Sequence, residues 1–301
     1  MEFEQQFASE EACHQYLFDL RWPNGFQCPR CHHPKAWLTK RKLYHCAECG
    51  YESSVIAGTI FQDTSKPLRV WFRAMWHVTN QKHGMSALGL QRALGLGSYR
   101  TAWTWLHKLR HAMVRPGRDR LSGRVEIDET YLGGPQAGKR GRGASGKTLV
   151  VIAVEVDGKH MGRIRLKQVS DASAKSLTLA IKESVESGSC ICTDDWNGYN
   201  PLQQLGYVHD IVRKESQIGE NLLPSANRVA SLLKRWLLGT HQGSVHPSHL
   251  PYYLDEFTFR FNRRTSLSRG KLFYRLVQQA VEVRPLSIRN IGRKPQHIGY
   301  T

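Results

Sequence analysis

The chain has 301 residues, of which 40% are hydrophobic and 23% are charged, as is typical of a folded globular protein of about two domains. Its 43 Lys and Arg outnumber 25 Asp and Glu and give a net charge of +18, which favours a polyanionic partner such as nucleic acid. No window approaches the roughly 18 apolar residues of a spanning helix, and the acidic N-terminus does not resemble a signal peptide. We therefore expect no membrane partner and a cytoplasmic location, where the seven cysteines would not form disulfides.

The first part of the chain is predicted to be rich in helices. Apolar periodicity predicts helices over 10–20, 68–80, 86–94 and 99–113. The last two flank the turn Gly95-Leu96-Gly97, and this outline is typical of a helix-turn-helix. The aromatic residues of this stretch recur at helical spacing, so we expect them in a core and not stacked on bases: Trp71, Phe72, Trp76, Trp103 and Trp105.

Two CxxC pairs, fourteen residues apart, precede these helices: Cys28, Cys31, Cys46 and Cys49. Each pair can supply two thiolates from a tight turn, which suits a tetrahedral Zn2+, and Gly50 fits the second turn. A segment of about 30 residues has too little core to fold without such a metal. A redox pair or four unrelated cysteines is the other interpretation, and the neighbouring histidines are alternative ligands: His32, His33 and His45.

After residue 123 the pattern changes to that of strands. We predict five strands and, between the third and fourth, one helix: 124–132, 148–156, 160–169, 189–194 and 207–214, with the helix over 172–187. Two more helices follow, over 226–238 and 247–262. Between the first two strands lies a glycine-rich basic loop that cannot be regular structure, and three of its side chains could follow a DNA backbone: Lys139, Arg140 and Arg142.

Two carboxylates lie at strand positions of this second part. Asp128 is on the first strand and Asp194 ends the fourth. Carboxylates on neighbouring strands can hold a divalent ion whose other ligands are water and phosphate oxygens, and a pair of such ions can drive an in-line displacement. Strand alternation puts Glu126 on the face of Asp128, and the pattern alone does not decide which of Glu126, Asp128 and Glu129 faces the metal.

The helix over 226–238 has an apolar stripe at the 3.6-residue period. Asn227 and Lys234 are seven residues apart on the opposite face, and Ser225 is the expected N-cap. On the pattern alone, an ordinary amphipathic helix with a solvated polar face is the favoured interpretation.

Together these motifs resemble the ISXO-like insertion-sequence transposases, which have an N-terminal zinc ribbon and a DDE-type domain. The resemblance covers nearly the whole chain and rests on motifs in order: RWPNGFQCPRC, YHCAECGYESSVIAGTIFQDT, MSALGLQRALGLGSYRTAW, VEIDETYLGG, TDDWNGY, LKRWLLGTHQGS and YLDEFTFRFNRR. It implies a ribonuclease-H-like catalytic domain, transposition through inverted terminal repeats and dependence on Mg2+ or Mn2+. It also implies that Asp128 and Asp194 are the first and second acids.

The third acid position departs from the usual family pattern. DDE enzymes usually carry a Glu seven residues before a Lys on this helix, whereas here Lys234 follows Asn227. An Asn carbonyl oxygen can bind a hard cation, but it brings no charge and cannot act as a base. We therefore expect weaker binding of one ion at Asp128, Asp194 and Asn227, and an unchanged fold. Glu220 or Glu256 could be recruited instead, and Lys234 would contact a DNA phosphate.

The expected fold class is an α+β multidomain chain with a mixed five-stranded sheet in its catalytic domain. The expected organisation is an N-terminal helix and turn (1–25), a zinc ribbon (26–66), a helix-turn-helix (67–114), a linker (115–123), the ribonuclease-H-like DDE-type domain (124–265) and a basic C-terminal tail (266–301).

The expected function is that of a transposase acting on double-stranded DNA, associated with a bacterial nucleoid. The second helix of the turn motif would lie in the major groove, with four contact candidates: Arg100, His107, Lys108 and Arg110. Both element ends must be held together, so a homo-oligomer on DNA is expected. Asn227 motivates one alternative, a catalytically impaired transposase-derived DNA-binding protein. Another is an RNA-directed ribonuclease-H-type nuclease, which would not need a ribbon and a helix-turn-helix.

Overall fold

The structure is a computed structural model that describes residues 2–115, 117–133, 147–212, 222–243, 245–268 and 270–292. The chain divides into two compact units. The helical unit comprises residues 1–116 and 266–291, and the sheet unit comprises residues 117–265 and 292–301. No helix in the described ranges has both the length and the apolar character needed to cross a bilayer.

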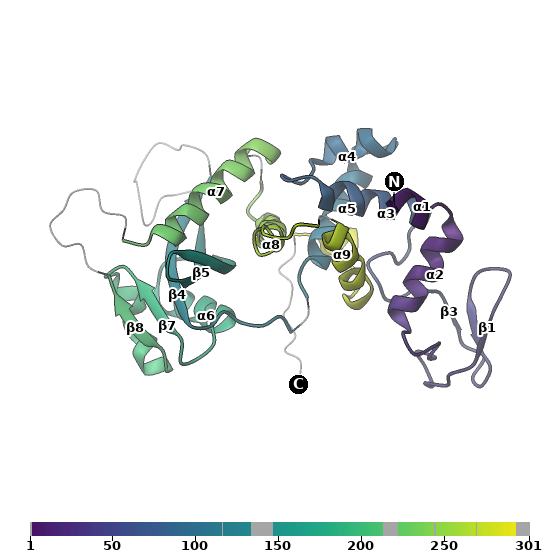
Figure 1. Cartoon of the computed structure of the whole chain (residues 1–301), viewed down its shortest axis with the longest axis horizontal. Coiled ribbons are helices and arrows are strands. Elements are labelled where there is room, and N and C mark those ends of the chain that lie inside the picture. Colours follow the sequence, from purple (N-terminus) through teal and green to yellow (C-terminus); the bar gives the residue numbers. More distant parts are fainter. Residues whose placement is uncertain are drawn as a thin grey trace. The chain divides into compact units, whose positions relative to one another are not determined.

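The helical unit contains a small three-stranded sheet and helices from both ends of the chain (Figure 1). In chain order its elements are α1 (Glu2–Gln6), α2 (Glu10–Arg21), β1 (Ala36–Leu38), β2 (Tyr44–Cys46), β3 (Glu52–Ser53), α3 (Leu68–Asn80), α4 (Ala87–Leu94), α5 (Tyr99–Ala112), α9 (Gly270–Glu282) and the 3-10 helix η2 (Ile288–Asn290). Three of the aromatic side chains expected in the core, Trp71, Phe72 and Trp105, are buried, and Trp71 stacks on Trp105 with ring centroids 3.8 Å apart.

The two helices of the predicted turn motif form α4 and α5. The Ser86 hydroxyl accepts a hydrogen bond from the Gly89 N–H at 3.1 Å and so caps the start of α4. Gly95 ends α4 with φ 62°, a left-handed conformation that glycine adopts without steric cost. The predicted helices and the turn between them are therefore confirmed.

Helix α9 lies within the segment 266–301 that the charge pattern assigned to a basic tail. Its apolar side chains recur every three or four residues and are buried: Leu272, Phe273, Leu276, Val277 and Ala280. They pack α9 against α2, α3 and α5. A tail is therefore the wrong description of residues 270–282. The basic character of the segment suggested a tail, but these residues form an amphipathic helix that completes the core of the helical unit.

The sheet unit is built on a mixed five-stranded sheet with the strand order β6-β5-β4-β7-β8. Its elements are β4 (Arg124–Leu132), β5 (Thr148–Asp157), β6 (His160–Val169), α6 (Ala174–Ser184), β7 (Cys190–Thr193), the 3-10 helix η1 (Asn197–Leu205), β8 (Val208–Ile211), α7 (Pro224–His241) and α8 (Leu250–Phe261). The strands β4, β5 and β6 pair antiparallel, and β4, β7 and β8 pair parallel. This order and these directions confirm the expected ribonuclease-H-like fold.

Successive side chains of the central strands point to opposite faces of the sheet and so belong to two separate hydrophobic cores. Val125 and Ile127 of β4 point to the face covered by α6, where they pack with Leu177 and Ile181. Ile152 and Val154 of β5 point to the other face, against α7 and α8. Because β5 is buried on both faces, its sequence reads as a continuous apolar run and not as an alternating one.

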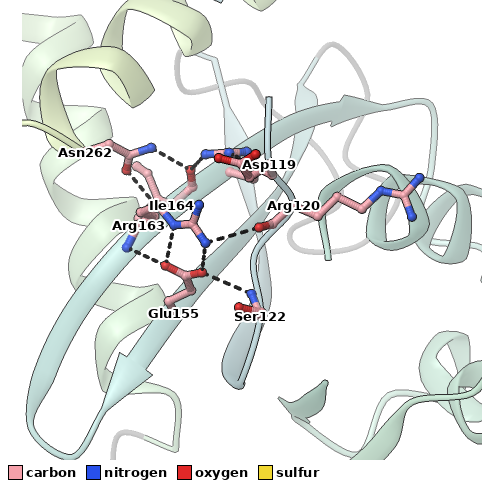
Figure 2. A network of polar contacts seen from close by, with 8 residues as sticks. Asp119, Arg120, Ser122, Glu155, Arg163, Ile164 and Asn262 are labelled. Atoms are coloured by element: carbon pink, nitrogen blue, oxygen red, sulfur yellow. Dashed lines mark hydrogen bonds and ion pairs between the residues drawn. The ribbon is translucent and has the colours of Figure 1, made fainter. Parts of the chain in front are cut away.

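The segment before β4 is fixed to the sheet, although part of it was expected to be a linker (Figure 2). The Glu155 carboxylate of β5 accepts a hydrogen bond from the Ser122 N–H at 3.0 Å and pairs with Arg163 of β6 at 2.6 Å. Arg163 in turn donates to the Arg120 carbonyl at 3.2 Å, and Leu121 is fully buried. Residues 120–122 are therefore part of the sheet unit, because they satisfy polar groups at its edge.

Residues that directly follow α8 bind backbone groups at the start of β6, as Figure 2 shows for Asn262 and Ile164. The Asn262 side chain accepts from the Ile164 N–H at 2.7 Å and donates to the Ile164 carbonyl at 3.2 Å. Arg264 donates to the carbonyls of Gly162, at 3.1 Å, and of Met161. These side chains occupy backbone groups that would otherwise be open to pairing with another strand.

Candidate functional site

The four ribbon cysteines form one cluster. Their sulfur atoms all lie within 4.8 Å of one another, and the Cys28–Cys49 and Cys31–Cys46 sulfur pairs are each 3.6 Å apart. Four sulfurs at about 2.3 Å from a tetrahedral Zn2+ would be about 3.8 Å apart, so the cluster fits this ion. No described histidine joins the group, which answers the question of alternative ligands in favour of the four thiols.

Each CxxC pair lies in a tight turn closed by backbone hydrogen bonds. The His32 N–H donates to the Cys28 carbonyl at 2.9 Å, and the Gly50 N–H donates to the Cys46 carbonyl at 3.1 Å. Gly50 has φ 67°, as the turn requires. Burial opposes ionisation of the Cys28 thiol, but hydrogen bonds from the backbone N–H groups of Cys31 and Arg30 and from the Cys31 and Cys49 thiols lower its pKa to about 6. At Cys31 the His33 backbone N–H favours ionisation, but burial and hydrogen bonds to the other thiols outweigh it and raise the pKa to about 12, so Cys28 ionises before Cys31.

The parallel pairing of β4 with β7 brings the two predicted acids to one end of the sheet. Val125 pairs with Ile191, and Glu126 pairs with Cys192. Continued by two residues, this register sets Asp128 beside Asp194, which directly follows β7. The Asp194 carboxylate accepts a hydrogen bond from the Trp196 N–H at 3.2 Å, which holds it in the turn after the strand.

A buried phenol lies next to these acids. Tyr199 of η1 is fully buried, and its burial raises its pKa well above the usual value. The negative charges of Glu129, Asp128 and Asp194 raise the pKa further. All three carboxylates therefore lie close enough to act on one hydroxyl. The sequence motif TDDWNGY contained Tyr199, but its spacing did not reveal this contact, which depends on how η1 folds back on the sheet.

Helix α7 begins beside these acids without a capping side chain of its own. Its N-cap is Leu223 and Pro224 occupies the first helical position, so the expectation that Ser225 caps the helix is wrong: Ser225 already lies within the first turn. The cap comes from β4 instead. The Glu126 carboxylate atom Oε2 accepts from the N–H groups of Ser225, at 2.8 Å, and Ala226, at 3.0 Å.

Asn227 and Lys234 are exposed on α7, as the helical spacing predicted. The Asn227 side-chain amide donates to the Leu223 carbonyl at 3.0 Å. Of the carboxamide atoms, the oxygen is the one that a cation would bind. Lys234 forms no ion pair within the part of the chain that the structure describes. Asp128, Asp194 and Asn227 all carry oxygen atoms, the donor type that hard divalent cations prefer.

The two alternative third acids differ in what is known of them. Glu256 of α8 has only 1% of its surface exposed and pairs with Arg260 at 2.8 Å. An acid already committed to a buried ion pair is a poor metal ligand, so the structure argues against its recruitment. Glu220 and the loop residues Lys139, Arg140 and Arg142 lie outside the described residues.

The four DNA-contact candidates of α5 have unequal access to solvent. His107 and Arg110 are 0% and 1% exposed; they are withdrawn as candidates, because a side chain enclosed in the core of its unit cannot reach a base edge. Lys108 is half-buried, with its ammonium 5.9 Å from the centre of the Trp71 ring, and burial lowers its pKa. Arg100 is exposed and lines a cavity of about 240 Å³ at the start of α5, together with Ser98, Thr101, Thr104, Trp105 and Ile288.

Comparison with known proteins covers both units. Residues 120–262 match the ISXO2-like transposase domain, and residues 8–52 match the transposase zinc-ribbon domain. A Halobacterium salinarum protein, described as an uncharacterized protein in transposable element ISH50, is 25% identical over 275 residues, which are 84% of this chain and 91% of that protein.

Solved structures that are similar to this chain include two nucleic-acid-processing proteins. One is the catalytic core domain of BIV integrase, with 15% identity and a TM-score of 0.29 over 49% of this chain and 86% of that one. The other is a pre-cleavage Mos1 transpososome, with 12% identity and a TM-score of 0.27 over 75% and 82%. The chain thus carries one segment that matches the ISXO2-like transposase domain and another that matches the transposase zinc-ribbon domain.

Proposed function

We propose that this chain binds the terminal inverted repeats of an insertion sequence and catalyses metal-dependent cleavage and strand transfer of DNA. The observation that carries the proposal is the parallel β4–β7 register, in which Glu126 pairs with Cys192, because Asp128 and Asp194 each lie two residues beyond that pair. The start of α7 is bonded to Glu126 of the same strand. The match of residues 120–262 to the ISXO2-like transposase domain supports it.

In this proposal Asp128, Asp194 and the Asn227 carbonyl oxygen hold Mg2+ or Mn2+. The ions supply charge stabilisation and an activated oxygen nucleophile for in-line displacement at phosphorus. The protein residues orient the ions and the scissile phosphate, and Lys234 places a mobile positive charge against a DNA phosphate. Water is the nucleophile that cuts the element end, and the freed 3' hydroxyl then attacks target DNA.

The helical unit would hold the element end. Its four thiolates bind a structural Zn2+, which stabilises the ribbon. Arg100 and the half-buried Lys108 are the contacts that we retain on α5, and the overall charge of +18 favours the DNA backbone. Cutting and joining at two element ends calls for more than one copy of the chain, so we propose a homo-oligomer on DNA.

The test is cleavage of a labelled duplex that carries the element's own end, with Mg2+ or Mn2+. We expect the natural chain to nick the end and Asp194→Ala to leave it intact while still binding it. A natural chain that binds the end but cuts it with neither metal would favour the second candidate function, a DNA-binding relic. Asn227 is the observation behind that candidate, and recovery of cutting by Asn227→Glu would assign the defect to that position.

A further inference from the structure

Glu126 links the strand that carries Asp128 to the helix that carries Asn227. Glu126 as a whole residue is 8% exposed, and one oxygen of its carboxylate, Oε2, accepts both the Ser225 and the Ala226 N–H. These two donors immediately precede Asn227 in α7, and Glu126 lies two residues before Asp128 on the same face of β4. The contact therefore fixes the first turn of α7 against the strand at the point where the proposed ligands meet.

No other side chain among the described residues caps the start of α7. The N-cap residue is Leu223, which has no polar side chain, and Pro224 has no N–H. The next two N–H groups have no partners within the helix, because the first turn of any α-helix leaves its donors open. A carboxylate at this place is also favoured by the positive end of the helix dipole. Glu126 thus satisfies donors that would otherwise be buried without a partner.

We propose that Glu126 is a positioning residue for the metal site, which acts by holding the Asn227 carbonyl oxygen at a set distance from Asp128. The inference rests on the proposed metal-dependent function of Asp128, Asp194 and Asn227. It also assigns a use to the glutamate of VEIDET that is separate from metal binding, since Glu126 directs its carboxylate at the α7 backbone.

The neutral third ligand makes such a tether more important. A glutamate at this position would be drawn to the ion by its own charge, whereas the Asn227 carbonyl is only a dipole. The attraction between an ion and an uncharged ligand is weak, so it cannot offset the entropy cost of ordering a loose helix end. An uncharged ligand therefore contributes to ion binding only when the protein already holds it in place. Binding of the ion should therefore depend on the reach of the Glu126 side chain more than on its charge.

Two substitutions separate reach from charge. Glu126→Gln keeps the length, and its single carbonyl oxygen can still accept both N–H groups, because Glu126 itself uses one oxygen. Glu126→Asp keeps the charge but shortens the side chain by one methylene, so that it cannot bond both groups with α7 in place. We measure Mn2+ binding to the full, zinc-loaded chain from the electron paramagnetic resonance signal of free Mn2+.

We expect Glu126→Gln to bind Mn2+ about as the natural chain does, and Glu126→Asp to bind on the order of tenfold more weakly. In an Asn227→Ala background, Glu126→Asp should cause no further loss, because its effect passes through Asn227. The matched control is Glu10→Asp in the helical unit. Glu10 caps α3 with both of its oxygens: Oε1 accepts from the Leu68 N–H at 2.7 Å and Oε2 from the Arg69 N–H at 3.0 Å. Because this cap lies in the other unit, the variant should leave Mn2+ binding unchanged.

The proposal is overturned if Glu126→Gln loses as much affinity as Glu126→Asp, since charge would then matter and not reach. Equal losses of Mn2+ affinity in Glu126→Asp and Glu10→Asp would likewise overturn it. So would a loss of affinity on adding Glu126→Asp to Asn227→Ala that is as large as the loss it causes in the natural chain. Failure of the proposed function looks different: the natural chain would then show no Mn2+ binding that Asp194→Ala removes.

Discussion

The ribbon cluster and the sheet site are two ways of assembling a metal site. In the ribbon, all four thiols come from one short stretch, Cys28 to Cys49, and two tight turns bring them together. In the sheet unit, the proposed ligands Asp128, Asp194 and Asn227 lie on or next to three separate elements, β4, β7 and α7, which strand pairing and the Glu126 contact hold together. The difference implies opposite orders of events. We expect the ribbon to fold only when it binds its metal, whereas the sheet unit should fold first and so bring its proposed metal ligands together.

Removal of zinc should therefore have the largest and most local effect. We expect a strong chelator, or Cys31→Ser, to unfold the ribbon, because a structural Zn2+ contributes roughly 10 kcal/mol to so small a core. The sheet unit should stay folded. Hydrogen exchange would measure this as lost protection in β1 to β3 with unchanged protection in β4 and β5. Equal loss of protection in both units would contradict the expectation that zinc stabilises the ribbon alone.

The next largest effect concerns the acids of the sheet site. Asp194→Ala should lower cleavage at least about a hundredfold, as loss of charge stabilisation at a reacting phosphate does, while the melting temperature changes little. Asp195→Ala is the matched control, since it removes the adjacent, exposed carboxylate. If Asp195→Ala abolishes cleavage and Asp194→Ala does not, the assignment of the second acid by register is incorrect.

Asn227→Glu tests the sheet site by adding the negative charge that its third proposed ligand lacks. It should lower the Mg2+ concentration needed for half-maximal cleavage by about tenfold, equivalent to about 1.4 kcal/mol of added ion binding. The first turn of α7 tolerates a carboxylate, because the helix dipole favours it. Ser231→Glu, one turn further along the exposed face of α7, controls for added charge in general and should leave the Mg2+ dependence unchanged.

The smallest effect is a contrast in pH dependence. Burial raises the pKa of Asp255 on α8 to about 6 from 3.8, against the opposing charges of Arg118, Lys167 and Arg165. The stability that this raised pKa contributes is present in full below about pH 4 and is lost as the pH rises through about 6. The ribbon should behave oppositely, since acid protonates its thiolates and releases the metal.

Thermal unfolding between pH 5 and 7.5 tests this contrast. Asp255→Asn should raise the melting temperature of the sheet unit at pH 7.5 and make little difference at low pH. A variant that stabilises equally at every pH would show that Asp255 acts through packing and not through ionisation.

The strands of the sheet unit and helices α2 to α8 could be predicted from sequence because each carries its own periodicity, whereas α9 was missed although its apolar residues are also periodic. The ribbon strands, two or three residues long, are too short for any period to appear, so their cysteines predicted the ribbon and not its sheet. On α5, the apolar periodicity did not predict that His107 and Arg110 are buried in the core, because both are polar residue types that usually stay exposed.

The sheet site could be predicted only in part, for a different physical reason. Asp128 lies within, and Asp194 directly after, strands that the pattern located. Helical spacing put Asn227 on a polar face, but only the family resemblance gave it a role. The roles of Glu126 and Tyr199 depend on contacts between segments far apart in the chain, which no local spacing encodes. Tertiary pairing, and not propensity, decides such positions.

The covered edge of β6 has a consequence for how this chain behaves in crowded conditions. Asn262 and Arg264 use the N–H of Ile164 and the carbonyls of Met161, Gly162 and Ile164. A foreign strand arriving at this edge finds those groups taken, so stacking of copies edge to edge through β6 is suppressed. The residues that follow α8 thereby make this end of β6 a poor template for cross-β stacking while the chain remains folded.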